Sequence, residues 1–241
     1  MLAAMRRAVL AALVAGLALT GSAAAQSGED GRAAREPLRV LFVGNSLTAT
    51  NDLPAIVAAL AAAAKRVPIE YATVAPGGVK LEDYWTFTGA RDALLARPWD
   101  VIVLQQGPSS LPESQVDLRT WAVRWAELAR EHGIRTAMLT VWPEAARSYA
   151  FPAVVRSYRA AAVAARATLL PAGSAWLAAW RRAPRLALYG TDDFHPSVLG
   201  STLAAMVVYA RLTGTPPSAV PLPFDARTTR ILRQAAAHAL R

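Results

Sequence analysis

"VLFVGNS", residues 40–46, is the stretch that decides the fold. An apolar run that ends in glycine is typical of a strand buried on both faces of a parallel sheet. Asn51 or Asp52 can then cap a helix that has Pro54 in its first turn. The sequence therefore predicts a strand followed by a helix, with the hydroxyl of Ser46 at the tip of the strand.

The same alternation of short apolar runs and helical patterns continues along the chain. Further strands are predicted from "VPIEYATVAP" (67–76), "DVIVLQQ" (100–106), "RTAMLTVWP" (135–143) and, more weakly, "ATLLPAG" (167–173). Helical patterns lie around Leu94 and over residues 114–132, 150–165, 196–213 and 225–240. Strands that alternate with helices predict one α/β domain, with a parallel five-stranded sheet covered on both faces.

The N-terminus predicts export. Arg6 and Arg7 precede an apolar run over 8–19, and a small-residue tail ends at Ala25, as in a cleavable secretory signal peptide over residues 1–25. The apolar run is shorter than the roughly 20 residues of a membrane helix, so no integral membrane segment is expected after cleavage. We expect a secreted or periplasmic protein with a flexible leader at 26–37 and a folded domain at 38–241. The paired arginines leave twin-arginine export open beside the Sec route.

The amino-acid composition limits which reactive groups and binding partners can be expected. Cysteine is absent, which excludes disulfides and a thiol nucleophile. The formal net charge is +9, and removal of the two arginines of the signal peptide leaves +7. Because the arginines are scattered along predicted helices rather than clustered with aromatic residues, no nucleic-acid partner is expected. A basic protein that binds the cell envelope through its charge is kept as an alternative. The sequence does not define an oligomeric state.

Ser46, His195 and Asp192 form a candidate catalytic triad. A serine hydroxyl needs a base within hydrogen-bond reach to act as a nucleophile, and histidine suits that task. The other two histidines of the chain have structural explanations in helices. Asp192, three residues before His195, can fold back to accept the Nδ1 proton, and Asp193 is the alternative acid.

Gly77 and Gly78 follow the second predicted strand and are candidates for binding a developing oxyanion. Glycine lets the backbone approach a ligand closely, so the N–H groups of Gly78 and Ser46 are predicted to stabilise that charge. Read separately, these glycines, the turn at 44–46 and the start of a helix near 192–197 are also common structural features. The sequence contains no His-Glu-x-x-His, Walker-type or Gly-x-Ser-x-Gly motif, and no metal or organic cofactor is expected.

Four segments together resemble a known family. These are "FVGNSLT" (42–48), "APGGVKLEDYW" (75–85), "VIVLQQGPSS" (101–110) and "YGTDDFHPSVLGSTLAA" (189–205). In this order and at these distances they resemble the SGNH (GDSL-like) hydrolase superfamily, over residues 38 to about 217. The resemblance implies a flavodoxin-like three-layer α/β/α sandwich. It also implies the activity of an esterase, lipase, thioesterase or carbohydrate deacetylase.

The resemblance assigns roles to the candidate residues. The nucleophile of the family maps onto Ser46, with Asn45 in place of the usual aspartate before it. The Asp-x-x-His block maps onto Asp192 and His195. The glycine of the second block maps onto Gly78 as an oxyanion donor. Together these roles imply a serine ester hydrolase that forms a covalent acyl-enzyme.

The third block departs from the family pattern. The family supplies an oxyanion donor from the asparagine of a Gly-x-Asn motif, and residues 105–110 contain no asparagine. Gln106 is the predicted substitute, because it offers the same amide chemistry on a longer side chain. Ser109, at the literal position of the asparagine, is the alternative.

We expect a small-molecule or glycan ester as substrate, and O-acetyl esters are favoured. The missing asparagine motivates an alternative, a non-catalytic glycan-binding protein on the same scaffold. Trp85, Trp142 and Trp176 lie near predicted strand ends or site-proximal loops and are candidates for stacking on a sugar, although buried tryptophans are more common. Arg147, after the fourth strand, is a candidate for contact with an acidic group of the substrate.

Overall fold

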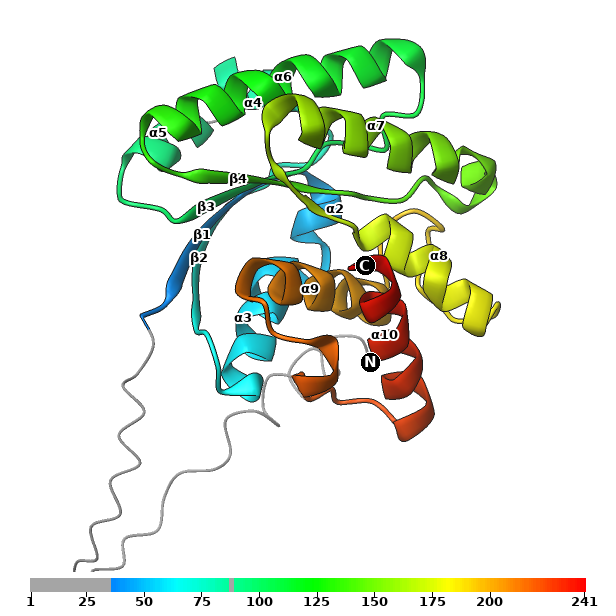
Figure 1. Cartoon of the computed structure of the whole chain (residues 1–241). Coiled ribbons are helices and arrows are strands. Elements are labelled where there is room, and N and C mark those ends of the chain that lie inside the picture. Colours follow the sequence, from blue (N-terminus) through cyan, green and yellow to red (C-terminus); the bar gives the residue numbers. More distant parts are fainter. Residues whose placement is uncertain (1–35, 87–88) are drawn as a thin grey trace, which may run out of the picture. The chain divides into compact units, whose positions relative to one another are not determined.

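The computed structural model describes residues 36–86 and 89–241. The predicted signal peptide at 1–25 and residues 26–35 of the predicted leader lie outside the described residues. The described part is built around one sheet, whose strands and flanking helices are shown in Figure 1.

The sheet has five strands, and every neighbouring pair is parallel. Its order is β2-β1-β3-β4-β5, the doubly wound order of flavodoxin-like folds. The strands are β1 (Leu38–Val43), β2 (Ile69–Val74), β3 (Val101–Leu104), β4 (Arg135–Leu139) and β5 (Thr168–Leu170). This confirms the predicted fold class. Because the strand order reverses between β1 and β3, a ligand-binding crevice is expected at the carboxyl ends of these two strands.

Helices cover both faces of the sheet (Figure 1). One face carries α4 (Leu81–Thr86), α5 (Ala90–Leu95), α6 (Pro112–Glu131) and α7 (Phe151–Ala165). The other carries α3 (Leu53–Ala64), α8 (Ala172–Arg182), α9 (Val198–Thr213) and α10 (Ala226–Ala239). The predicted helices are present, whereas α4 and α8 were not predicted. Gly173 near the start of α8 is needed for close packing, because a Cβ there would lie 2.3 Å from the Val141 carbonyl oxygen.

The two central strands form the middle of the core. Every residue of β3 is buried, and β1 is buried from Val40 to Val43. Such continuous burial requires the unbroken apolar runs seen in the sequence, since the buried positions of these strands are covered on both faces of the sheet. Helix α9 is buried from Gly200 to Ala210 and packs against α3 and α8. The ends of β1 and β3 are therefore held on a rigid support.

Residues Ser46–Ala64 are long and apolar enough to cross a membrane by length and composition alone. In the structure this segment consists of three pieces: α2 (Ser46–Ala49), the 3-10 turn η1 (Thr50–Asp52) and α3. Asn51 and Asp52, with φ of 59° and 52°, break the helix between them. Because α3 packs against β2 and α9, and core helices commonly pass the same test, the segment is weak evidence for a membrane span.

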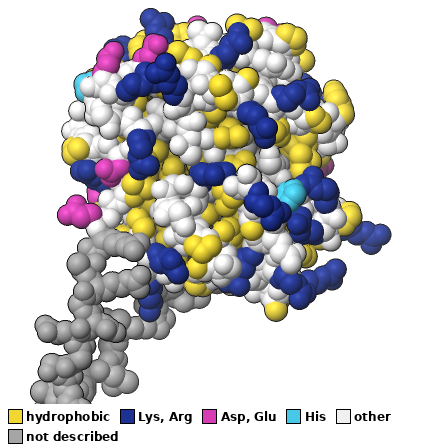
Figure 2. Space-filling view, in the orientation of Figure 1, with side chains coloured by type: hydrophobic (Ala, Val, Ile, Leu, Met, Phe, Trp, Pro, Cys, Tyr) yellow, Lys and Arg dark blue, Asp and Glu magenta, His cyan; other side chains and the backbone are white. Residues whose placement is uncertain are grey.

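Basic side chains are spread over the surface and interleaved with neutral and apolar ones (Figure 2). Two of them form ion pairs with acidic side chains. Arg39 donates two hydrogen bonds of 3.2 Å to the carboxylate of Asp100, and Arg97 pairs with Glu70 at 2.7 Å. Because solvent screens exposed pairs of this kind, they adjust the surface more than they define the fold.

Candidate active site

The nucleophile candidate, Ser46, lies directly beyond β1 and begins the short helix α2. Gly44 allows the turn, since a Cβ there would lie 2.4 Å from Thr48 Oγ1 and 2.6 Å from Gln105 Oε1. Asn45 caps α2, because its side-chain oxygen accepts a hydrogen bond from the Leu47 N–H at 3.1 Å. Ser46 itself is half-buried. Its hydroxyl is thus carried by a tightly packed turn.

The structure joins Ser46, His195 and Asp192 in a hydrogen-bonded chain. His195 Nε2 lies 2.9 Å from Ser46 Oγ, and His195 Nδ1 lies 2.5 Å from Asp192 Oδ2. Hydrogen bonding from the His195 ring, helped by the backbone N–H of Phe194, lowers the pKa of Asp192 to about 2. The ionised carboxylate can only accept, so Nδ1 carries the ring proton and Nε2 is free to accept the serine proton.

The turn around Asp192 fixes this carboxylate. Asp192 Oδ1 accepts from the N–H groups of Phe194 at 3.1 Å and His195 at 2.9 Å, so both of its oxygens are engaged. Asp193 has a φ of 56°, and its carbonyl accepts from the Ala145 N–H at 2.8 Å. Of the two aspartates, the structure places Asp192 beside the imidazole ring and directs the backbone of Asp193 towards the loop after β4.

Trp142 and Trp176 support the turn that carries His195, here called the histidine turn. Their rings stack at 3.7 Å with an interplanar angle of 7°, and Trp142 Nε1 donates to the Phe194 carbonyl at 3.1 Å. Both side chains are buried, with relative exposures of 1% and 0%. Of the two roles considered for these tryptophans, the structure supports packing in the core rather than stacking on a sugar. Their rings are enclosed by protein, and their role is to support the turn that carries His195.

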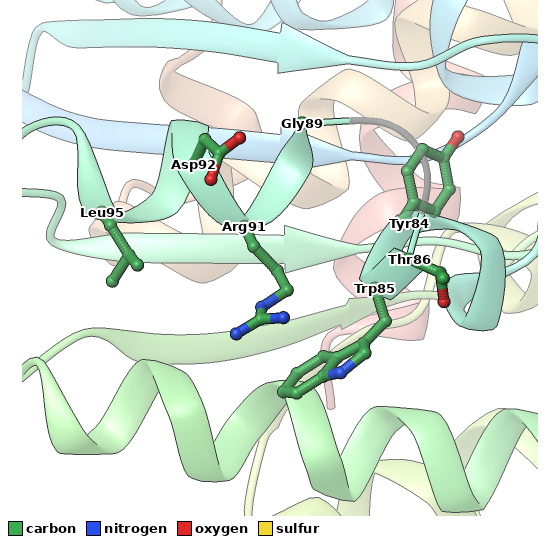
Figure 3. Close-up of a pocket in the computed structure, with 7 residues that line it drawn as sticks. All are labelled: Tyr84, Trp85, Thr86, Gly89, Arg91, Asp92 and Leu95. Atoms are coloured by element: carbon green, nitrogen blue, oxygen red, sulfur yellow. The ribbon is translucent and has the colours of Figure 1, made fainter.

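Trp85 lies in a different place, at a pocket of about 240 Å³ beside α4 and α5 (Figure 3). The guanidinium groups of Arg91 and Arg124 lie 4.7 and 5.0 Å from its ring centroid. Both cations already contact the ring, and the pocket contains no member of the Ser46, His195 and Asp192 set. This geometry does not support sugar stacking by Trp85.

The predicted oxyanion donors Ser46 and Gly78 lie on adjoining loops. Gly78 is exposed and has a φ of +75°, a conformation that glycine adopts without strain. Asn45 ties the two loops together, because its Nδ2 donates to the Val79 carbonyl at 3.3 Å. Within the described residues, the backbone N–H groups of Ser46 and Gly78 have no hydrogen-bond partner. Both donors are therefore available to a ligand.

Gln106 and Ser109, the candidates for the third donor, are buried beside each other. Gln106 Nε2 donates to Asp117 Oδ2 at 2.9 Å and to Ser109 Oγ at 3.2 Å, while its Oε1 accepts from the Leu81 N–H at 3.0 Å. Ser109 Oγ donates to the Gly107 carbonyl at 3.0 Å. Donation from Gln106 to an oxyanion stays a prediction, and it requires the exchange of one of these internal hydrogen bonds.

Arg147 lies on the 3-10 turn η2 (Ala145–Ala150), after β4. Its Nη2 is 3.4 Å from Ser110 Oγ, and its Nε is 3.8 Å from the carboxylate of Glu144. Contact with an acidic substrate stays a prediction for this half-exposed arginine. For a metal, the described residues offer no group of three or more histidine or acidic side chains that could hold the ion.

Sequence reasoning missed two residues that organise the site, Asn51 and Gln105. Asn51 Nδ2 donates to the Pro196 carbonyl at 2.8 Å and thereby links the nucleophile segment to the histidine turn. Gln105, buried after β3, bonds both Asn45 and Thr48. The available signal was an uncharged amide at the carboxyl end of a fully apolar strand, where a polar side chain needs a specific partner.

The sequence matches no protein-family model and no curated protein. The fold matches several solved structures. A protein of Slackia heliotrinireducens, described as a candidate SGNH hydrolase, is 25% identical, with a TM-score of 0.62 over 73% of this chain and 100% of its own. A DUF4886 family protein from Bacteroides uniformis matches at 18% identity, with a TM-score of 0.70 over 85% and 95% of the two chains. An acetylxylan esterase from Geobacillus stearothermophilus matches at 14% identity, with a TM-score of 0.59 over 78% and 98%.

The match to the Slackia protein supports the SGNH hydrolase superfamily for this chain, at low sequence identity. The matches below 25% identity show the shared fold alone. The Slackia protein, at 25% identity and covered in full, supports a hydrolase. The fold therefore supports a hydrolase, and the hydrogen bond between Ser46 and His195 is the geometry from which its mechanism can be proposed.

Proposed function

We propose that the protein is an exported serine ester hydrolase that removes short O-acyl groups, above all O-acetyl, from glycans or other small esters. The observation that carries the proposal is the hydrogen-bonded chain from Ser46 Oγ through His195 to Asp192, with separations of 2.9 and 2.5 Å. This chain supplies the base and the orienting acid that a serine nucleophile needs.

In the proposed reaction Ser46 Oγ attacks the ester carbonyl while His195 Nε2 takes the serine proton. The N–H groups of Ser46 and Gly78, with Gln106 or Ser109, stabilise the oxyanion. Nε2 then returns the proton to the leaving alcohol as the C–O bond breaks. Water, deprotonated by His195, attacks the acyl-enzyme and releases the acid and free Ser46. Asp192 stabilises the imidazolium in both steps.

The openness of the site supports a small acyl group on a bulky alcohol. The side chains of His195 and Asp192 retain 32% and 51% of their accessible surface, and Gly77 and Gly78 are exposed. A large polymer can approach such an edge, whereas a long acyl chain gains affinity by burial in an apolar channel. The fold shared with an acetylxylan esterase and the predicted export signal support the same substrate class.

A fluorophosphonate probe tests the nucleophile directly. We expect a covalent adduct on Ser46, located by peptide mass spectrometry and abolished in Ser46→Ala. His195→Ala should slow labelling strongly, while Ser218→Ala, a change of an exposed serine in the 3-10 turn η3 (Pro217–Ala219), should label normally. A folded wild-type protein that forms no adduct would overturn the proposal. Acetate release from acetylated xylan, compared with hydrolysis of p-nitrophenyl octanoate, then tests the substrate class.

A non-catalytic glycan-binding protein is the second candidate. It is favoured by one observation, that both amide hydrogens of Gln106 are engaged within the protein. A binder of this kind would release no acetate and would keep its affinity for acetylated xylan in Ser46→Ala. Calorimetric titration of the wild-type and Ser46→Ala proteins distinguishes the two functions.

A further inference from the structure

Gln105 is the most densely bonded side chain near the nucleophile. Its Oε1 accepts from the Asn45 N–H at 2.8 Å and from Thr48 Oγ1 at 2.7 Å. Its Nε2 donates to Asn45 Oδ1 at 3.0 Å and to the Gln106 carbonyl at 2.6 Å. Every usual hydrogen-bonding position of this amide is filled, although the residue is only 1% exposed.

These bonds meet on the residues that flank Ser46. Asn45 precedes the nucleophile and Thr48 follows it by two residues, so the side-chain amide of Gln105, directly after β3, is bonded to the turn on both sides of Ser46. Asn45 extends the network, since its Nδ2 reaches the Val79 carbonyl beside Gly78. The orientation of the Ser46 N–H and the placement of the Gly78 loop therefore depend on the same pair of amides.

We propose that Gln105 is the positioning residue for the nucleophile and oxyanion loops, acting through Asn45 and Thr48. This inference rests on the proposed ester hydrolysis. Gln105 touches no reacting atom, and its contribution is to hold Ser46 Oγ and the two backbone donors in one fixed geometry. Displacements of about 1 Å at such a centre lower rates by about 10²-fold without a comparable loss of substrate binding.

The chemistry of position 45 fits this role. An asparagine can accept from Gln105 Nε2 through Oδ1 and donate to Val79 through Nδ2, and the structure shows both bonds. An aspartate in its place would have no donor for the Val79 carbonyl. Asn45 and Gln105 therefore form a matched pair, each of which uses its donor and its acceptor.

The test compares Gln105→Leu and Gln105→Glu with Thr140→Val. Glutamate keeps the shape of the side chain and the acceptor for Asn45 N–H and Thr48, but when ionised it loses both donated bonds. Thr140 is the matched control, because it is 0% exposed, follows β4, and makes two buried bonds, to the Leu170 carbonyl at 3.1 Å and from the Gly173 N–H at 3.0 Å. The rate of Ser46 labelling by the fluorophosphonate and the hydrolysis of p-nitrophenyl acetate are measured beside urea unfolding.

We expect both Gln105 variants to lose about 10²-fold in kcat and in labelling rate, with KM within about twofold of wild type. Thr140→Val should lose stability and keep its kcat. If Gln105→Leu does not fold, Gln105→Glu carries the comparison alone. A folded Gln105 variant with wild-type kcat and labelling rate, beside an active wild type, overturns the positioning role and leaves the proposed function intact. A wild type that neither labels nor hydrolyses overturns the proposed function instead.

Discussion

The side chain of Asn51 holds the backbone of Pro196 at a distance of 2.8 Å. Asn51 lies five residues after Ser46, and Pro196 directly follows His195, so the bond joins the two segments that carry the nucleophile and its base. The same Nδ2 donates to Ser201 Oγ at 3.0 Å, at the start of α9. The separation of Ser46 and His195 is therefore fixed by a neighbouring hydrogen bond as well as by their own.

Asn51→Gly tests this link. Glycine accepts the φ of 59° at this position, so the turn survives while both donated bonds are lost. We expect kcat for p-nitrophenyl acetate to fall about 10-fold and the free energy of unfolding to fall by about 1–2 kcal/mol. Asp225→Ala, which removes the N-cap of α10, should cost about 1 kcal/mol and leave kcat unchanged. An unchanged kcat in Asn51→Gly would show that the segments align without the link.

Asp192→Asn should lower kcat by about 10²–10⁴-fold, because an amide that donates to Nδ1 selects the tautomer with a proton on Nε2. That proton blocks the acceptor that Ser46 needs. The matched variant is Asp193→Asn, since the backbone bond from Ala145 to Asp193 does not depend on its side chain. Steady-state kinetics at pH 8 distinguish them. Equal losses in the two variants would refute the assignment of Asp192.

The stability conferred by Asp192 should depend on pH in the acid range. Its pKa in the folded protein is about 2, below the ordinary value of 3.8, so the ionised form favours folding. The contribution is complete above about pH 4 and is lost as the pH falls through about 2. Urea unfolding of the wild type and Asp192→Asn should show a difference that shrinks over this window. Because the side chain is 51% exposed, solvent screening keeps the difference small, and a difference that grows in acid would contradict the assignment.

Gly44→Ala should damage stability and activity together. The added methyl group would lie 2.4 Å from Thr48 Oγ1 and 2.6 Å from Gln105 Oε1, inside the contact distance of both atoms. We expect a loss of about 1–3 kcal/mol and a fluorophosphonate labelling rate reduced with it. Gly77→Ala is the stability control, since a Cβ there meets nothing within 4 Å. Similar unfolding midpoints for the two variants would mean that the turn at Gly44 relaxes without cost.

The sequence predicted the fold well because the parallel strands are buried on both faces, and such strands must be nearly continuous apolar runs. The short helix α4 was missed because six residues are too few to show a helical period. Helix α8 was missed because Ala172 and Gly173 were placed at the end of the predicted strand 167–173, whereas Gly173 lies in the helix and allows its close approach to Val141. A local sequence pattern shows which secondary structure a segment favours on its own. Helices α4 and α8 depend instead on packing against neighbouring segments.

The same limit applies to the candidate site. Asp192 and His195 were predictable because their interaction is local, within one turn of chain. Gln105 and Asn51 form hydrogen bonds across separations of 60 and 145 residues, and no neighbouring residue in the sequence indicates what they bond to. The sequence left two roles open for Trp142 and Trp176 for a related reason. A tryptophan near a strand end can face the solvent or the core, and only the packing of the histidine turn decides between them.

Ser46 and His195 are 149 residues apart along the chain. Helix α3 follows the nucleophile segment and α9 follows the histidine turn, and these two helices pack against each other. The pair can therefore meet only when α9 has docked against α3, a contact between segments far apart in the sequence. A chain that is still being synthesised or refolded carries Ser46 without His195 beside it, so the reactivity of Ser46 indicates that the domain has completed its folding.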